Sequence, residues 1–297
     1  MPKVQVSVIP NEAKRLIAKA VAQMAVVKAA MKSGIILLKG GTTVSAVAEE
    51  LVGIKMSISG RITPNGAKAA NAETARFHRL LIKNGTPINL NTYSEIEEVA
   101  VQMEKSDILI TGANAIDFER KTAIMVGHQT GGSAGMLPKI IARGVHTIIP
   151  VGWEKLIPCS INTALSAAGI QAIDFAMGMA VGLIPINGLV VTETDAVGML
   201  TGVHTTVIGA GGILGGEGST TFVMEGDSTE LKEAWELVSG VKGTEVSGIA
   251  ETLVECYPGS PLCNAKIEIG SRKVANHRGC AYFRPGIIKK VLGVKED

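Results

Sequence analysis

The segment Lys39–Thr43, which reads KGGTT, has the composition of an anion-binding turn. It follows the apolar run Ile35–Leu38, which is typical of a buried parallel strand, and precedes apolar residues with helical spacing. Where a strand leads through glycines into a helix, backbone N–H groups at the helix N-terminus point at an anion. We therefore expect five phosphate-binding residues: Lys39, Gly40, Gly41, Thr42 and Thr43. The alternative is an ordinary strand-to-helix turn with a threonine cap.

A second candidate segment closes the apolar run Asp107–Thr111 and reads TGANAID from Thr111 to Asp117. In open α/β sheets, functional side chains collect at the carboxyl ends of the strands. We expect Asp117 to be a catalytic carboxylate. Three residues are expected to line the ligand site: Thr111, Gly112 and Asn114. The alternative for Asn114 and Asp117 is a cap between the strand and a following helix.

The third candidate segment is glycine-rich and reads GHQTGGS from Gly127 to Ser133. An imidazole titrates near neutral pH and serves as a general acid or base, so His128 is the second catalytic candidate. A purely structural histidine is the alternative. The residues that follow offer an amide, a hydroxyl and close backbone approach. Four of them are expected to bind the ligand: Gln129, Gly131, Gly132 and Ser133.

Two further segments carry weaker signals. The loop Gly209–Gly218 is rich in glycine and holds Glu217, but no dinucleotide fingerprint or P-loop lysine accompanies it. A flexible hairpin connection is therefore favoured over a phosphate site. Cys256, Cys263 and Cys280 include no Cys-x-x-Cys pair, so we predict unliganded thiols and no metal site.

The composition excludes several classes of protein. The 297 residues are 46% hydrophobic and 19% charged, which argues against disorder, and the net charge of +2 without a long basic run argues against a nucleic-acid partner. The absence of an apparent signal peptide, and cysteines that read as thiols, favour a cytoplasmic protein. Prolines and glycines interrupt the weakly charged stretch Leu156–Thr192, so it is expected to be buried and not to span a membrane. The many apolar residues also predict a homo-oligomer.

The order of the expected elements indicates an α/β fold. One long helix is expected over Asn11–Lys32, and strands then alternate with helices, which predicts a mainly parallel sheet in residues 1–184. The later order is strand, helix, strand, strand, helix, strand, beginning at Ile186–Val191 and ending at Thr244–Ile249. This order predicts a second, smaller α+β domain of ferredoxin-like type in residues 185–297, with an irregular tail.

Three segments together resemble one superfamily. Lys39–Thr43, Asp107–Asp117 and Gly127–Pro158, which ends in VGWEKLIP, are similar to segments of ribose-5-phosphate isomerases, glucosamine-6-phosphate deaminases and CoA transferases. Within that superfamily the resemblance is greatest to lactate-utilisation (LUD-type) domains. It implies a Rossmann-like parallel sheet in which the three segments converge on one pocket at the strand ends. It also implies a sugar phosphate or an acyl-CoA as ligand. No resident cofactor is expected, and CoA would enter as a substrate or ligand.

The sequence departs from the isomerase pattern where that family moves a proton. Asn114 and Ala115 stand in place of an acidic pair, and His128 and Gln129 stand near the position of a lysine. Only Asp117 remains of the expected set, so ribose-5-phosphate isomerase activity is not expected.

These features predict a protein that binds a small anionic metabolite, phosphorylated or CoA-linked, with isomerase-like or transferase-like chemistry. Two alternatives from other classes stay open. One is a non-catalytic metabolite sensor, and the other is an accessory subunit of a lactate-oxidation-type system.

Overall fold

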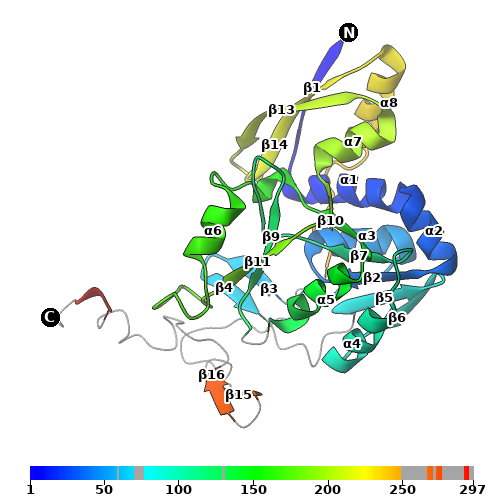
Figure 1. Ribbon diagram of the computed structural model, residues 1–297. Helices are drawn as coiled ribbons and strands as arrows, with labels where there is room; N and C mark the ends of the chain where they lie inside the picture. The colour runs from blue at the N-terminus through cyan, green and yellow to red at the C-terminus, as the bar shows by residue number, and fades with distance from the viewer. Residues whose placement is uncertain are drawn as a thin grey trace.

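The computed structural model describes residues 1–58, 60–69, 77–128, 131–248, 266–269, 272–275 and 291–293. Its centre is a mixed sheet of six strands (Figure 1). In spatial order these are β12 (Leu189–Val191), β10 (His146–Pro150), β7 (Ile108–Thr111), β2 (Ile35–Lys39), β5 (Arg79–Lys83) and β6 (Thr86–Asn89). The first four run parallel, whereas β5 and β6 form an antiparallel hairpin at one edge. The expected α/β class and a mostly parallel central sheet are confirmed.

Helices cover both faces of the central sheet because its strands are apolar on both sides. In β2, Ile36 and Leu38 pack into one core, and Leu37 packs into the core on the opposite face. The helices of the first face are α1 (Pro10–Gln23), α2 (Ala25–Ser33), α3 (Thr42–Val52) and α7 (Glu193–Thr201). Those of the second face are α4 (Tyr93–Gln102), the 3-10 helix η2 (Gly132–Met136) and α5 (Leu137–Ala142).

Smaller sheets surround this centre. One contains β1 (Lys3–Val8), β14 (Ser219–Glu225) and β13 (His204–Gly211), with α8 (Ser228–Ser239) packed on it. Another contains β11 (Gly182–Ile186), β9 (Thr122–Val126) and β8 (Ala115–Ile116), near η3 (Trp153–Lys155) and α6 (Ile161–Ala167). Two hairpins complete the set: β3 (Gly60–Thr63) with β4 (Gly66–Ala69), and β15 (Lys266–Ile269) with β16 (Arg272–Ala275). Helix α1 lies between α3 and α7 and so connects the central sheet with the sheet of β1, β14 and β13 (Figure 1).

The single helix expected over Asn11–Lys32 is two helices. Helix α1 ends at Gln23, and Met24 adopts an extended ψ of 134° before α2 begins at Ala25. The apolar spacing continues across Met24, so periodicity alone does not reveal the break.

The later part of the chain differs from the expected ferredoxin-like order. The expected strand Ile186–Val191 is split, because β11 pairs with β9 whereas β12 joins the central sheet. Residues 244–248 of the expected strand Thr244–Ile249 are irregular, and residue 249 lies outside the described residues. The sheet beside α7 and α8 takes β1 as its remaining strand.

Strand β1 fits that position because its alternating residues supply a buried face. Val6 and Val8 pack in the same core as Phe222 of β14, and this core continues to Ile36 of the central sheet. The expected domain boundary between residues 184 and 185 falls within β11, and β1 pairs with a strand from beyond that boundary. Hydrogen bonds and core packing therefore join residues on both sides of it.

Among the described residues, no helix is both long enough and apolar enough to cross a membrane. The weakly charged stretch Leu156–Thr192 contains the short helix α6 and the strands β11 and β12, separated by turns. The expected burial is wrong for residues 156–177, of which only Ile161 is buried, because the turns and α6 lie at the surface.

Candidate functional site

The carboxyl ends of the four parallel strands β12, β10, β7 and β2 lie together at one end of the central sheet, which we call its carboxyl edge. Lys39, the last residue of β2, is in register with Thr111, the last residue of β7. A Cβ atom built on Gly112 would lie 3.8 Å from a methyl carbon of Val44 in α3. The KGGTT and TGA segments therefore lie side by side at this edge.

The turn after β2 leaves a helix N-terminus without a capping side chain. Helix α3 begins at Thr42, its N-cap is Gly41, and no side-chain cap is formed. The threonine cap considered from the sequence is therefore not what the structure contains. A Cβ atom on Gly40 would lie 2.9 Å from the carbonyl oxygen of His78, so the absence of a side chain lets the backbone just before β5 approach the turn. The first backbone N–H groups of α3 are thus available to an anion.

Two cationic side chains lie together at this edge. Lys39 and Arg79 are directly opposed in the antiparallel pair of β2 and β5, and both line a small pocket on the face covered by α4 and α5. Burial, followed by the positive charge of Arg79, lowers the pKa of Lys39 to about 8. Within the described part of the chain, no hydrogen bond or ion pair engages the partly buried Lys39 ammonium.

Arg79 is buried and held by α4 and the segment before it. Its guanidinium carbon lies 4.5 Å from the centroid of the Tyr93 ring, and its Nη1 donates a hydrogen bond to the carbonyl of Asn91 at 3.4 Å. The pocket beside Lys39 and Arg79 has a volume of about 10 Å³, enough for about one water molecule. A metabolite would therefore have to bind along the outer edge of the sheet, over these two cations.

His78 precedes Arg79 and is uncharged at neutral pH. Burial lowers its pKa to about 4, and the charges of Arg79 and Lys39 act in the same direction. Its Nδ1 lies 3.3 Å from the carbonyl oxygen of Ser57. His78 thus contributes a neutral imidazole beside two cations.

The second glycine-rich turn approaches the same place. Gly131 and Gly132 have left-handed φ values of 81° and 54°, which glycine adopts readily. A Cβ atom on Gly132 would lie 3.6 Å from both the His128 Cβ atom and the Tyr93 hydroxyl. Burial lowers the pKa of the partly buried His128.

The structure therefore brings the second glycine-rich turn to Tyr93, which in turn contacts Arg79. Gln129 lies outside the described residues. Ser133 is described through its backbone in η2.

Asn114 and Asp117 lie in the β8–β9 hairpin, where both side chains accept backbone hydrogen bonds. The Asn114 Oδ1 atom accepts from the Met125 N–H at 2.9 Å. The Asp117 carboxylate accepts from the N–H groups of Glu119 at 3.0 Å and Lys121 at 2.9 Å through Oδ1. Its Oδ2 accepts from the Ile161 N–H at 2.9 Å.

These contacts give Asp117 a clear structural role. Burial would raise the pKa of this fully buried carboxylate, but its backbone hydrogen bonds outweigh burial and lower the pKa. The capping alternative applies in a different form, because a strand and not a helix follows Asp117: the carboxylate closes the β8–β9 turn and holds the start of the distant helix α6.

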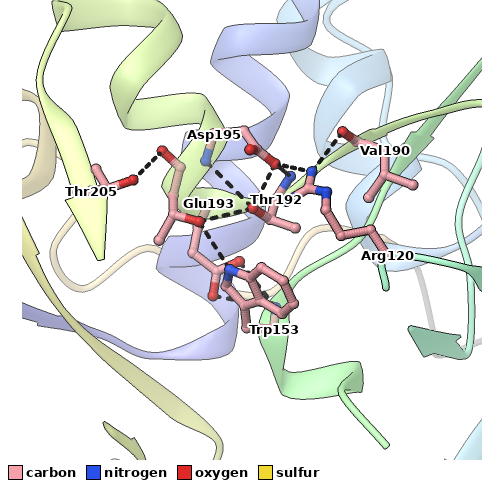
Figure 2. A network of polar contacts seen from close by, with 8 residues as sticks. Arg120, Trp153, Val190, Thr192, Glu193, Asp195 and Thr205 are labelled. Atoms are coloured by element: carbon pink, nitrogen blue, oxygen red, sulfur yellow. Dashed lines mark hydrogen bonds and ion pairs between the residues drawn. The ribbon is translucent and has the colours of Figure 1, made fainter. Parts of the chain in front are cut away.

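A separate polar network joins the ends of β10 and β12 (Figure 2). The Trp153 indole N–H donates to the Thr194 hydroxyl at 2.9 Å, and the Trp153 backbone N–H donates to Glu193 Oε2 at 3.1 Å. Arg120 reaches this network from the β8–β9 turn and donates to Asp195 Oδ2 at 2.6 Å. The network fixes the start of α7 against the segment that follows β10.

Glu193 and Glu154 form a buried pair of carboxylates beside Lys14 of α1. Burial raises the pKa of the fully buried Glu193 to about 7, and the charge of Glu154 acts in the same direction. Neither Glu154 oxygen has a hydrogen-bond partner within the described residues, although the Lys14 ammonium lies 3.8 Å from Oε1. A side chain at Gly152 would clash with the Glu154 carboxylate, so this glycine makes room for it.

The sequence interpretation did not include His78, Arg79, Tyr93 or the buried acids. A signal was present in the basic pair His78–Arg79 at the head of an apolar run. Its meaning depends on strand direction, because the first residue of an antiparallel strand lies beside the last residue of its neighbour. The sequence did not reveal that β5 runs antiparallel to β2.

No group of three or more metal-ligating side chains forms a site within the described ranges, which leave out Cys256, Cys263 and Cys280. Comparison with known proteins adds no relative, because no protein-family model and no curated protein matches this chain.

Proposed function

We propose that the carboxyl edge of the central sheet binds a small anionic metabolite, phosphorylated or CoA-linked. The observation that carries this proposal is Lys39, a partly buried ammonium that no described carboxylate neutralises and that lies directly opposite Arg79. The charge of Glu95 acts favourably on Arg79, whereas no described carboxylate acts on Lys39, so the Lys39 ammonium beside a second cation favours an anionic ligand. The uncapped start of α3 adds backbone N–H groups that favour the same charge.

The proposed chemistry is isomerase-like or transferase-like, carried by the Rossmann-like arrangement that the sequence resemblance implies. His128 is the proposed acid or base, and CoA would enter as a substrate or ligand. Asp117 is proposed to support the site through the hairpin and not to react. A non-catalytic sensor and a subunit of a lactate-oxidation-type system are the alternatives. A cytoplasmic location and the absence of a nucleic-acid partner belong to the same proposal.

Thermal-shift measurements with sugar phosphates, acyl-CoA, nucleotides and 2-hydroxy acids test the binding proposal. A ligand that raises the melting temperature should bind Lys39→Gln at least about 10-fold more weakly, because a charge-assisted contact is lost. Lys83→Gln is the matched control, since the exposed Lys83 lies at the opposite end of the same strand pair. Equal affinity of Lys39→Gln and the wild type would contradict this site.

A homo-oligomer is also proposed, through the exposed edge of β13. This strand carries neither lysine nor proline, and the hairpin after it exposes 78% of Ile213 and 96% of Leu214. We expect light scattering to give a mass of at least two 30.9-kDa chains. Leu214→Lys should dissociate the oligomer, whereas Met199→Lys, at another exposed apolar residue, should not. A monomer at micromolar concentration would contradict the expectation.

A further inference from the structure

We propose that Lys39 is a nucleophile that forms an imine with an anionic carbonyl compound, while Arg79 holds the anionic group of that compound. This inference rests on the proposed function, because it assigns a substrate class to the same site. It goes further by giving the two cations different tasks. One reacts with the ligand, and the other binds it.

The backbone pairing places the two side chains within reach of one small molecule. Lys39 and Arg79 are partners in the antiparallel register, and such partners have Cα atoms about 4.5–5.5 Å apart and side chains on one face. Both line the same small pocket. A compound bound along the outer edge of the sheet, whose carbonyl carbon lies one or two bonds from a carboxylate or phosphate group, can therefore contact both.

The surroundings of Lys39 suit a group that reacts, and those of Arg79 suit a group that binds an anion. The Arg79 guanidinium is fixed by the Tyr93 ring and the Asn91 carbonyl, and an arginine stays charged when it is buried. Lys39 has no carboxylate within the described residues to hold its proton, and burial beside Arg79 favours the neutral amine. A lysine near another cation in a partly desolvated site is the usual setting of an imine-forming amine.

The reaction balances without a further reagent. The protonated Lys39 first gives its proton to solvent, and the lone pair of Nζ attacks the carbonyl carbon, whose π electrons move to oxygen. Proton transfer from nitrogen to that oxygen gives a carbinolamine. The hydroxyl group then accepts a proton from solvent and leaves as water, and a carbon–nitrogen double bond forms. No electron is gained or lost, so neither an oxidant nor a reductant takes part.

Reductive trapping tests this step on the full chain. Glyoxylate and glycolaldehyde phosphate are the probes, because each joins an aldehyde to an anion, one a carboxylate and the other a phosphate. Neutral glycolaldehyde is the control probe. Cyanoborohydride converts each imine into a stable secondary amine, which peptide mass spectrometry assigns to individual lysines. Lys83 provides the internal reference.

We expect the anionic probes to modify Lys39 on the order of 10-fold faster at pH 7 than an ordinary exposed lysine. The rate at Lys39 should be half-maximal near pH 8. Inorganic phosphate should slow the reaction at Lys39 and leave Lys83 unaffected. Neutral glycolaldehyde should show a smaller preference for Lys39, because it lacks the anionic group that Arg79 is proposed to hold. The more reactive anionic probe identifies whether the site favours carboxylates or phosphates.

The arginine role is tested separately with Arg79→Gln, provided that its melting temperature shows a folded protein. This variant should lose the preference for anionic over neutral aldehydes. If Arg79→Gln unfolds, protection of Lys39 by phosphate in the wild type is the remaining readout, and absence of protection contradicts the role of Arg79.

Two results would overturn the inference in distinguishable ways. If the anions bind in the thermal-shift assay but Lys39 reacts no faster than Lys83, imine formation is wrong and the proposed binding function stands. If the anions neither bind nor protect Lys39, both proposals are wrong.

Discussion

Replacing Asp117 by alanine should lower the free energy of unfolding by about 4 kcal/mol, the largest single effect that we expect. The carboxylate accepts hydrogen bonds from three backbone N–H groups, those of Glu119, Lys121 and Ile161. An alanine would leave these donors without their partner in a buried place. Urea unfolding at neutral pH measures the change.

Two control substitutions test whether the loss of stability comes from these hydrogen bonds. Asp117→Asn should cost about half as much, because an amide oxygen can still accept from Glu119 and Lys121 but the amide nitrogen opposes the Ile161 N–H. Asp174→Ala, at an exposed aspartate, should change stability by less than about 0.5 kcal/mol. A stable Asp117→Ala variant that binds ligand but loses turnover would instead support the catalytic role predicted from the sequence.

Between pH 4.5 and above 7, the free energy of unfolding of Glu193→Gln should rise by about 3 kcal/mol relative to the wild type, since one pKa unit corresponds to about 1.4 kcal/mol. The pKa of Glu193 is about 7 in the folded protein and 4.5 as an ordinary glutamate. Between these values the folded state binds more protons than the unfolded state, so Glu193 lowers stability as pH rises. Relative to the wild type, Glu193→Gln should therefore become more stable as pH increases from 4.5 to above 7.

His78 makes stability depend on pH in the opposite direction, so it hides the effect of Glu193 on the stability of the wild type. Its pKa is about 4 when folded and 6.5 as an ordinary histidine, so between these values the unfolded state binds more protons and stability rises with pH. The two groups oppose each other between pH 4.5 and 6.5. When the pH falls from 7 to 4.5, Glu193→Gln should therefore lose more stability than the wild type does.

Unfolding curves of the wild type, Glu193→Gln and His78→Asn across this range check the assignment. The variants should deviate from the wild type in opposite directions as pH falls. Burial and then the charge of Glu154 raise the pKa of Glu193, so Glu154→Gln should lower that pKa by removing an unfavourable charge. A Glu193→Gln profile parallel to that of the wild type would show that Glu193 is ionised in the folded protein.

The sequence predicted the parts of the fold that depend on local pattern. The apolar run Thr122–Val126 before the second glycine-rich turn predicts a strand, and β9 has these bounds. The apolar run Ile35–Leu38 is a buried parallel strand whose last residue is Lys39. Glycine turns and continuous apolar runs identify such elements without knowledge of distant residues.

Features that depend on pairing between distant segments were not accessible in this way. The alternation in Lys3–Ile9 predicts a strand, found as β1, but not its pairing with β14. The sequence order places the expected strand Thr244–Ile249 in that sheet, and its described residues are irregular. The same limit applies to the candidate site. Arg79 lies opposite Lys39 because β5 runs antiparallel to β2, and the charge of Glu154 acts on Glu193 because β10 and β12 are neighbours.

The pairing of β1 with β14 has a consequence for synthesis of the chain on the ribosome. Lys3 pairs with Glu225, so β1 must wait for more than two hundred further residues before its partner strand is made. At about 5–20 residues per second, this delay is roughly 10–40 s. Throughout that interval Val6 and Val8 lack the strand that will bury them. A nascent chain of this protein is therefore a candidate for chaperone binding at its N-terminal strand until translation passes residue 225.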